Sequence, residues 1–259
     1  MTELEANPQQ NHGALAARWR ALTQARVGLG RTGVSLETRD LLDFQRAHAQ
    51  ARDAVHSRLD AVALAVELER ATQFEVLRVC SACTDRTIYL QRPDLGRRLD
   101  DASREKLATL ADGADYELIV IFADGLSALA VERHAVPLMK ELLPLLAGWS
   151  IGPIVVVEQG RVAIGDEIGL ALKAHISVVL IGERPGLSSP DSLGAYITWE
   201  PRPGRIDAER NCISSIRAEG LSYKLAAEQL RRYLTEARRR RLTGVELKLE
   251  SGTERLMDR

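Results

Sequence analysis

The fold is decided by the stretch LIVIFADGLS at residues 118–127, where an apolar run ends at small and polar residues. A run so rich in Ile and Val predicts a strand that is buried on both faces. A helical pattern follows at residues 127–146, and the next apolar run lies at residues 154–157. Because strand, helix and strand follow one another at this spacing, they predict a parallel βαβ unit.

The same alternation continues on both sides of this unit. Further apolar runs lie at residues 76–79, 178–181 and 195–199, and further helical patterns lie at residues 103–110, 165–174 and 223–240. Since crossovers between parallel strands are right-handed, the alternation favours an α/β fold with a doubly wound, mainly parallel, Rossmann-like sheet.

The N-terminal part of the chain has a different composition. It is rich in Ala, Leu, Arg and Asp, and a Gly-rich segment at residues 28–33 precedes apolar residues spaced three and four apart at residues 41–55. This spacing predicts an amphipathic helix. We therefore expect a small N-terminal helical region at residues 1–70 and a Rossmann-like domain at residues 71–259.

Composition excludes several classes of protein. The chain has 259 residues, of which 45% are hydrophobic, and its 35 Lys and Arg nearly balance its 36 Asp and Glu. This balance argues against nucleic acid or a membrane surface as a partner. No apolar run reaches the roughly 18 residues that span a bilayer. No secretory signal is visible, and three cysteines fit a reducing interior, so we expect a cytoplasmic protein.

Small and polar residues follow three of the predicted strands, at residues 124–127, 158–162 and 182–190. Glycine lets the backbone approach a ligand closely, and helix starts offer free N–H groups. One such turn is typical of any βα connection. Three of them at the carboxyl edge of one sheet predict a broad binding surface, although they do not identify its ligand.

Known catalytic signatures are missing. The sequence has no complete dinucleotide-binding or Walker motif after a strand and no hydrolase nucleophile elbow. The five histidines are dispersed, and Cys80-x-x-Cys83 lacks the second pair of ligands that a zinc site needs. We therefore expect neither catalytic residues nor a metal site, and the residues alone predict an α/β ligand-binding protein.

Seven groups of residues also carry a family resemblance. They are ARVGLGRTG at 25–33, LLDFQ at 41–45 with AHAQARDAV at 47–55, YLQRPDLGRRL at 89–99, DGLS at 124–127, GRV at 160–162 with DEIG at 166–169, IGERPGLSS at 181–189, and NCIS at 211–214. From about residue 20 to about residue 245, the chain resembles the small (light) subunit of ethanolamine ammonia-lyases.

The resemblance implies a subunit of an adenosylcobalamin-dependent lyase that converts ethanolamine to acetaldehyde and ammonia. A large barrel-forming subunit would perform the radical chemistry, and this chain, inactive alone, would help hold the cobalamin at the interface of the hetero-oligomer. The alternative is a free-standing α/β regulatory protein that binds a corrinoid or a nucleotide. The N-terminal residues show no amphipathic leader, so enclosure in a bacterial microcompartment is the less expected location.

The resemblance further implies cobalamin contacts at Val162, Glu183 and Cys212. Val162 would contact the corrin through its backbone or its apolar side chain, and Glu183 would accept hydrogen bonds from corrin amides. Cys212 would pack close to the corrin at the start of the last helix. The alternatives are a local ion pair of Glu183 with Arg184 or Arg205, and a Cys212 that belongs to the core.

Overall fold

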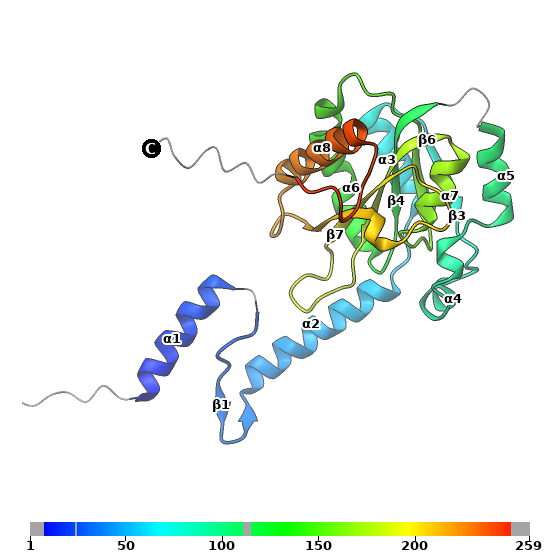
Figure 1. Cartoon of the computed structure of the whole chain (residues 1–259). Helices are drawn as coiled ribbons and strands as arrows, with labels where there is room; N and C mark the ends of the chain where they lie inside the picture. Colours follow the sequence, from blue (N-terminus) through cyan, green and yellow to red (C-terminus); the bar gives the residue numbers. More distant parts are fainter. Residues whose placement is uncertain (1–7, 24, 111–114, 250–259) are drawn as a thin grey trace, which may run out of the picture. The chain divides into compact units, whose positions relative to one another are not determined.

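The computed structural model describes residues 8–23, 25–110 and 115–249 (Figure 1). The described residues form two compact units, of which the first contains those up to residue 53 and residues 186–190, and the second contains those from residue 54 to residue 185 and from residue 191 onward. The division into domains at residue 70 stays a prediction. Within the described ranges, no helix has the length and apolar character needed to cross a membrane.

The second unit is built around a six-stranded mixed sheet with the order β3-β5-β4-β6-β7-β8. Its strands are β3 (Val76–Cys80), β4 (Tyr116–Ala123), β5 (Ile154–Glu158), β6 (Ala174–Gly182), β7 (Leu193–Trp199) and β8 (Arg210–Ile216). β3, β5, β4 and β6 are parallel to one another, whereas β7 runs antiparallel to β6 and β8 antiparallel to β7. The predicted α/β class and mainly parallel sheet are confirmed in these terms.

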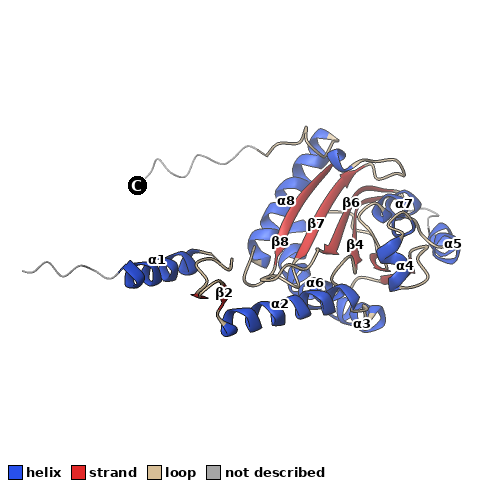
Figure 2. Cartoon of the chain, turned by 90° about the horizontal axis from the view of Figure 1, so that it is seen from below, coloured by secondary structure: helices blue, strands red, loops and turns tan. Residues whose placement is uncertain are grey.

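Helices cover both faces of this sheet (Figure 2). On one face lie α3 (Ala61–Thr72), α6 (Ala128–Leu142) and α8 (Tyr223–Arg240), and on the other lie α5 (Asp101–Leu110) and α7 (Ile164–Ala171). β4 shows why both faces are apolar. Leu118, Val120 and Phe122 belong to the first face and Ile119 and Ile121 to the second, all 0% exposed. The predicted burial of residues 118–122 is therefore confirmed.

The connections that move forward along the strand order lie on one face of the sheet, and the connection that moves backward lies on the other. From β4 the chain steps back to β5 through α6, and from β5 it steps forward past β4 to β6 through α7 on the opposite face. The step from β3 to β4, through α5, is also forward and lies on the face of α7. Forward and backward steps on opposite faces are what a single crossover handedness requires.

Element boundaries differ from the predictions in a few places. The predicted helix at residues 165–174 ends at Ala171, because β6 already begins at Ala174. The helix predicted at 127–146 is α6 followed by the 3₁₀ turn η2 (Leu143–Leu146). Several elements were not predicted, among them α3, β8, the short α4 (Arg86–Gln91) and the 3₁₀ turn η1 (Leu95–Arg97). A third 3₁₀ turn, η3 (Asp207–Glu209), precedes β8.

At each end of β4, a carboxylate side chain accepts hydrogen bonds from a backbone N–H and from an arginine of other segments. Glu117, near its first residue, accepts hydrogen bonds from Ser150 N at 2.9 Å and from the Arg238 guanidinium at 2.9 Å. Asp124, directly after its last residue, binds a backbone N–H and a guanidinium in the same way. The position of β4 within the sheet is thus fixed from two sides.

The first unit contains α1 (Pro8–Leu22), a small hairpin of β1 (Arg31–Thr32) and β2 (Ser35–Leu36), and most of α2 (Thr38–His56). The Gly-rich segment leads into this hairpin, and Gly33 occupies its tight turn with a φ of +65°. The apolar stripe predicted at residues 41–55 lies on α2, as expected.

Candidate functional site

The turn after β4, residues 124–127, lies inside the protein. Asp124 and Ser127 are fully buried, and Leu126 N donates to Gly182 O at 2.9 Å. A Cβ atom on Gly182 would overlap the carbonyl oxygens of Asp124 and Ser127, so glycine is needed for this close approach. The expectation that all three turns face a ligand is therefore wrong for this one, because its polar groups bind within the fold.

The loop between β5 and α7 carries Val162 at the carboxyl edge of the sheet. Its carbonyl oxygen accepts a hydrogen bond from Gly165 N at 3.1 Å, in the first turn of α7. The side chain is half-buried and packs against the apolar cluster on the α5–α7 face. Val162 thus has its carbonyl engaged and offers a partly exposed apolar side chain.

Glu183 follows β6 directly, and its carboxylate lies over the adjacent strand. Oε2 accepts a hydrogen bond from Ser215 N at 3.1 Å, and a Cβ on Gly194 would lie 3.1 Å from Oε1. The described residues show no ion pair of Glu183 with Arg184 or Arg205. Arg205 instead pairs with Glu200 and Glu209. The local pairing considered as the alternative for Glu183 is thus not found.

Cys212 lies in the middle of β8, opposite Tyr196 of β7, rather than at the start of the last helix. This placement corrects the prediction, which missed β8 because the strand reads RNCISSI and has few apolar residues. Ile213 faces the buried core on the α8 side, so Cys212 projects from the opposite face. Its thiol is exposed, and Sγ lies 3.3 Å from Ser214 Oγ. The alternative of a core cysteine is therefore wrong.

Tyr196 lies opposite Cys212 and interacts with both Cys212 and Glu183. It was not predicted from the sequence. Burial raises the pKa of its phenol, and the neighbouring Cys212 thiol and Glu183 carboxylate add to this rise. The phenol therefore keeps its proton and can donate a hydrogen bond. We call Glu183, Tyr196, Cys212 and Ser214 the open patch. Val162 packs against the same apolar cluster as Tyr196.

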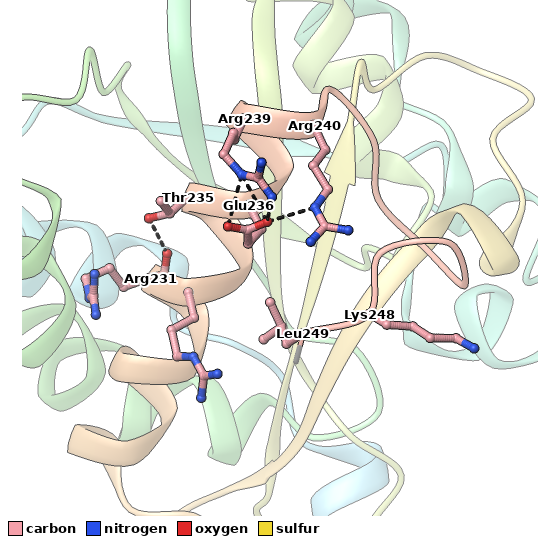
Figure 3. A pocket seen from close by; sticks show the side chains of 8 residues that line it. Arg231, Thr235, Glu236, Arg239, Arg240, Lys248 and Leu249 are labelled. Carbon is pink, nitrogen blue, oxygen red and sulfur yellow. Dashed lines mark hydrogen bonds and ion pairs between the residues drawn. The ribbon is translucent and has the colours of Figure 1, made fainter. Parts of the chain in front are cut away.

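A hollow on the outer side of α8 encloses about 300 Å³ (Figure 3). It is lined by Arg231, Arg232, Thr235, Glu236, Arg239, Arg240, Lys248 and Leu249. Glu236 binds Arg239 at 2.7 Å and Arg240 at 2.8 Å, while the Lys248 side chain points away from them. Because its cations are exposed and two of them already pair with Glu236, this hollow has the character of a solvated helix end.

Among the described residues, neither a metal centre nor a reactive pair of Cys80 and Cys83 is supported. In the described part of the chain, no group of three or more His, Cys, Asp or Glu side chains could hold a metal ion. Burial raises the pKa of both the Cys80 and the Cys83 thiol, which lowers the fraction of reactive thiolate. The open patch is therefore the best candidate for a binding site.

Comparison with known proteins gives a consistent result. Residues 14–248 match the family described as "Ethanolamine ammonia-lyase light chain (EutC)". The chain is 57% identical over 241 residues to the ethanolamine ammonia-lyase small subunit of Pseudomonas aeruginosa strain LESB58, covering 92% of this chain and 88% of that protein. The small subunit of Xanthomonas campestris pv. campestris strain B100 is 56% identical over 239 residues, with 91% and 88% covered. Val162, Glu183 and Cys212 all lie within the matched range.

Proposed function

The chain belongs to the ethanolamine ammonia-lyase light chain family, and from this premise we propose that it binds adenosylcobalamin together with a large subunit. It is the small subunit of an ammonia-lyase. In the proposed hetero-oligomer, the large subunit holds ethanolamine and converts it to acetaldehyde and ammonia, and the cobalamin lies between the two chains. The observation that carries the proposal is the open patch, where hydrogen-bond donors and acceptors lie together on β7, β8 and the residue after β6.

The sheet supports this assignment. Helices lie on both of its faces and the crossovers change face with direction, which agrees with a doubly wound, Rossmann-like arrangement. In such sheets, ligands bind outside the carboxyl ends of the strands, where Val162 and Glu183 lie. We propose residues 71–259 as the cobalamin-binding domain and residues 1–70 as an N-terminal helical region. We expect the complex in the cytoplasm, and cell fractionation would reveal the alternative, a bacterial microcompartment.

The groups of the open patch fit a corrin. Corrin carries amide side chains around a wide ring, so its recognition needs both donors and acceptors. Glu183 Oε1 can accept while Oε2 stays with Ser215 N, the Tyr196 phenol can donate, and the Ser214 hydroxyl can do either. When bound, adenosylcobalamin supplies the homolysis of its cobalt–carbon bond.

We assign a role to each predicted contact residue. Val162 offers its apolar side chain to the corrin edge, and Glu183 accepts hydrogen bonds from corrin amides. Cys212 is small and, like Ser214 and Ser215, exposed on β8, so the ring can approach the backbone of this strand there. All three bind and orient the cofactor, and none transfers a proton.

The proposal is tested with the purified chain and the matching large subunit. Acetaldehyde should form only when both chains, ethanolamine and adenosylcobalamin are present, and the two chains should elute together in gel filtration. Acetaldehyde formation by this chain alone would contradict the proposal. Elution as a lone species beside the large subunit would favour the free-standing regulator.

The site itself is tested in the same complex. A hydrogen bond to a charged group contributes about 1.5–3 kcal/mol, so Glu183→Ala should weaken cobalamin binding about tenfold or more. Cys212→Trp should weaken it further, because the indole would occupy the space of the ring. Glu141→Gln, an exposed change on α6, is the matched control. Unchanged cobalamin affinity in both site variants would remove Glu183 and Cys212 from the assignment.

A further inference from the structure

A buried ion pair lies behind the loop that carries Val162. Arg86, the first residue of α4, is 4% exposed, and Asp124, after β4, is 0% exposed. Arg86 Nη1 lies 3.3 Å from Asp124 Oδ2. A buried pair of charges adds little stability compared with apolar residues of the same volume. Its role therefore lies in the other bonds that the two side chains make.

These bonds join three separate segments of the second unit. Asp124 Oδ1 accepts a hydrogen bond from Gly160 N at 3.0 Å, in the loop after β5. Arg86 Nη1 donates to Gly125 O at 2.9 Å and approaches Gln159 Oε1 at 3.4 Å. Arg86 Nε donates to Val55 O at 2.8 Å, in the last turn of α2. The pair thus connects the end of α2, the turn after β4 and the loop after β5.

The loop after β5 is also held by Tyr89. This ring is fully buried, and its centroid lies 4.7 Å from the Arg86 guanidinium and 4.1 Å from that of Arg161. The Tyr89 hydroxyl donates to Gly160 O at 3.2 Å. Both backbone polar groups of Gly160 are therefore bound by buried side chains, two residues before Val162. A loop fixed in this way is preorganised for binding, since ordering it costs nothing further when the ligand arrives.

We propose that Arg86 and Asp124 are positioning residues for the cofactor, because they fix the loop at residues 159–162 from beneath. This inference rests on the proposed function. Neither side chain touches the ligand, and both act through the backbone of Gly160 and the side chain of Gln159.

The pair has a pH dependence that makes its role measurable. Burial raises the pKa of the Asp124 carboxyl to about 6. The ionisable groups that interact with Asp124 are Arg86 and Tyr89 from α4, Cys80 at the end of β3 and Cys83 in the segment after β3. Burial raises the pKa of Tyr89 and both cysteines, and Arg86 stays charged. Near pH 6, Asp124 alone among these groups changes its charge, and the loop then loses an ionic partner.

The test uses the complex with the large subunit and the variant Asp124→Asn. Equilibrium binding of adenosylcobalamin is followed by absorbance after ultrafiltration, between about pH 5 and about pH 8. The wild type should bind more weakly as the pH falls below about 6, where Asp124 is protonated. Asp124→Asn should bind about tenfold more weakly at neutral pH, as for other residues that orient a ligand-binding group, with no such decline below pH 6.

Hydrogen exchange supplies a readout that does not depend on the cofactor. Amides of the loop at residues 159–162 should lose protection in Asp124→Asn, because Gly160 N loses its charged acceptor. Glu117→Gln is the matched control, since Glu117 binds a backbone N–H and an arginine at the opposite end of β4. It should change neither the exchange of the loop nor the cobalamin affinity.

Arg86→Lys keeps the positive charge but cannot reach both Val55 O and Gly125 O. It should weaken cobalamin binding as Asp124→Asn does, and it tests the inference if Asp124→Asn does not fold. If both variants fail to fold, a wild-type cobalamin affinity and loop protection that do not decline below about pH 6 would overturn the inference. If the variants fold and keep the wild-type loop protection and cobalamin affinity at every pH, the inference is overturned and the proposed function stays intact. A wild-type complex that binds no cobalamin would refute the proposed function itself.

Discussion

Replacing Asp166 by Ala tests how β8, the strand of Cys212, is held to the rest of the protein. Asp166 lies in the first turn of α7 and is 2% exposed, and Arg210 at the start of β8 is 6% exposed. Two hydrogen bonds join them, Nη1 to Oδ1 at 2.8 Å and Nη2 to Oδ2 at 2.7 Å. Asp166→Ala removes both bonds and leaves the buried guanidinium with one distant carboxylate, that of the fully exposed Asp207, whose Oδ1 lies 3.9 Å from Arg210 Nε.

The size of the expected loss of stability depends on the hydrogen bonds that Arg210 retains in Asp166→Ala. Breaking a buried ion pair costs about 3–5 kcal/mol, because the remaining charge stays uncompensated. Arg210 still donates to Thr198 Oγ1 at 2.8 Å and to Arg205 O at 3.1 Å, which partly replaces the lost solvation. We therefore expect a loss near the lower end, about 3 kcal/mol, in the free energy of unfolding.

Urea denaturation of the full chain at neutral pH measures this loss. The control is Asp94→Ala, which removes an equally short ion pair with Arg92 at 2.7 Å, where both side chains are more than half exposed. Solvent screens such a pair, so this variant should unfold at nearly the wild-type urea concentration. Replacing both members, as Asp166→Leu with Arg210→Met, should recover most of the stability. A loss below about 1 kcal/mol for Asp166→Ala would refute the reasoning.

Three further predictions concern the core, a close backbone contact and pH. Phe122→Ala should lower the free energy of unfolding by about 3–5 kcal/mol in urea titrations, because the ring is fully buried between β4 and the helices of the α6–α8 face. Gly182→Ala should cost about 1–3 kcal/mol and lower the melting temperature, because its Cβ would overlap the Ser127 carbonyl. Burial lowers the pKa of His134 below 6.5, so the folded state favours the neutral ring and stability is lost as the pH falls through 6.5. His134→Gln should remove that part of the decline when unfolding is measured from about pH 8 to about pH 5.

The sequence predicted the buried strands and the long helices, because periodicity and composition determine them. The runs at 118–122 and 154–157 are apolar at every position, and such a pattern is expected only of strands that are covered on both faces. The helix at residues 223–240 has the bounds predicted for it. Periodicity does not encode strand direction, so β7 was counted among the parallel strands although it is antiparallel. β8 was missed because Ile213 and Ile216 are its only large apolar residues and do not alternate with polar ones, which gives little apolar signal.

The candidate site was only partly predictable. Gly, Asp and Ser after a strand have the same composition whether a turn faces a ligand or is buried. The turn at residues 124–127 is buried because its Asp124 binds Arg86 and Gly160, which are distant in sequence. Tyr196 had a weak signal, an aromatic side chain on the partly exposed face of β7. The family resemblance, rather than any local pattern, selected Glu183 and Cys212, and the fold then accounts for how both reach the open patch.

The carboxylates at the two ends of β4 have a consequence for how the chain tolerates insertions. Glu117 and Asp124 each need an arginine and a backbone N–H from another segment, so the number of residues between them must match the distance between those partners. One residue added or removed within β4 would also exchange its inward and outward side chains. Length changes should therefore accumulate in the surface connections of this family and be rare between these two acids.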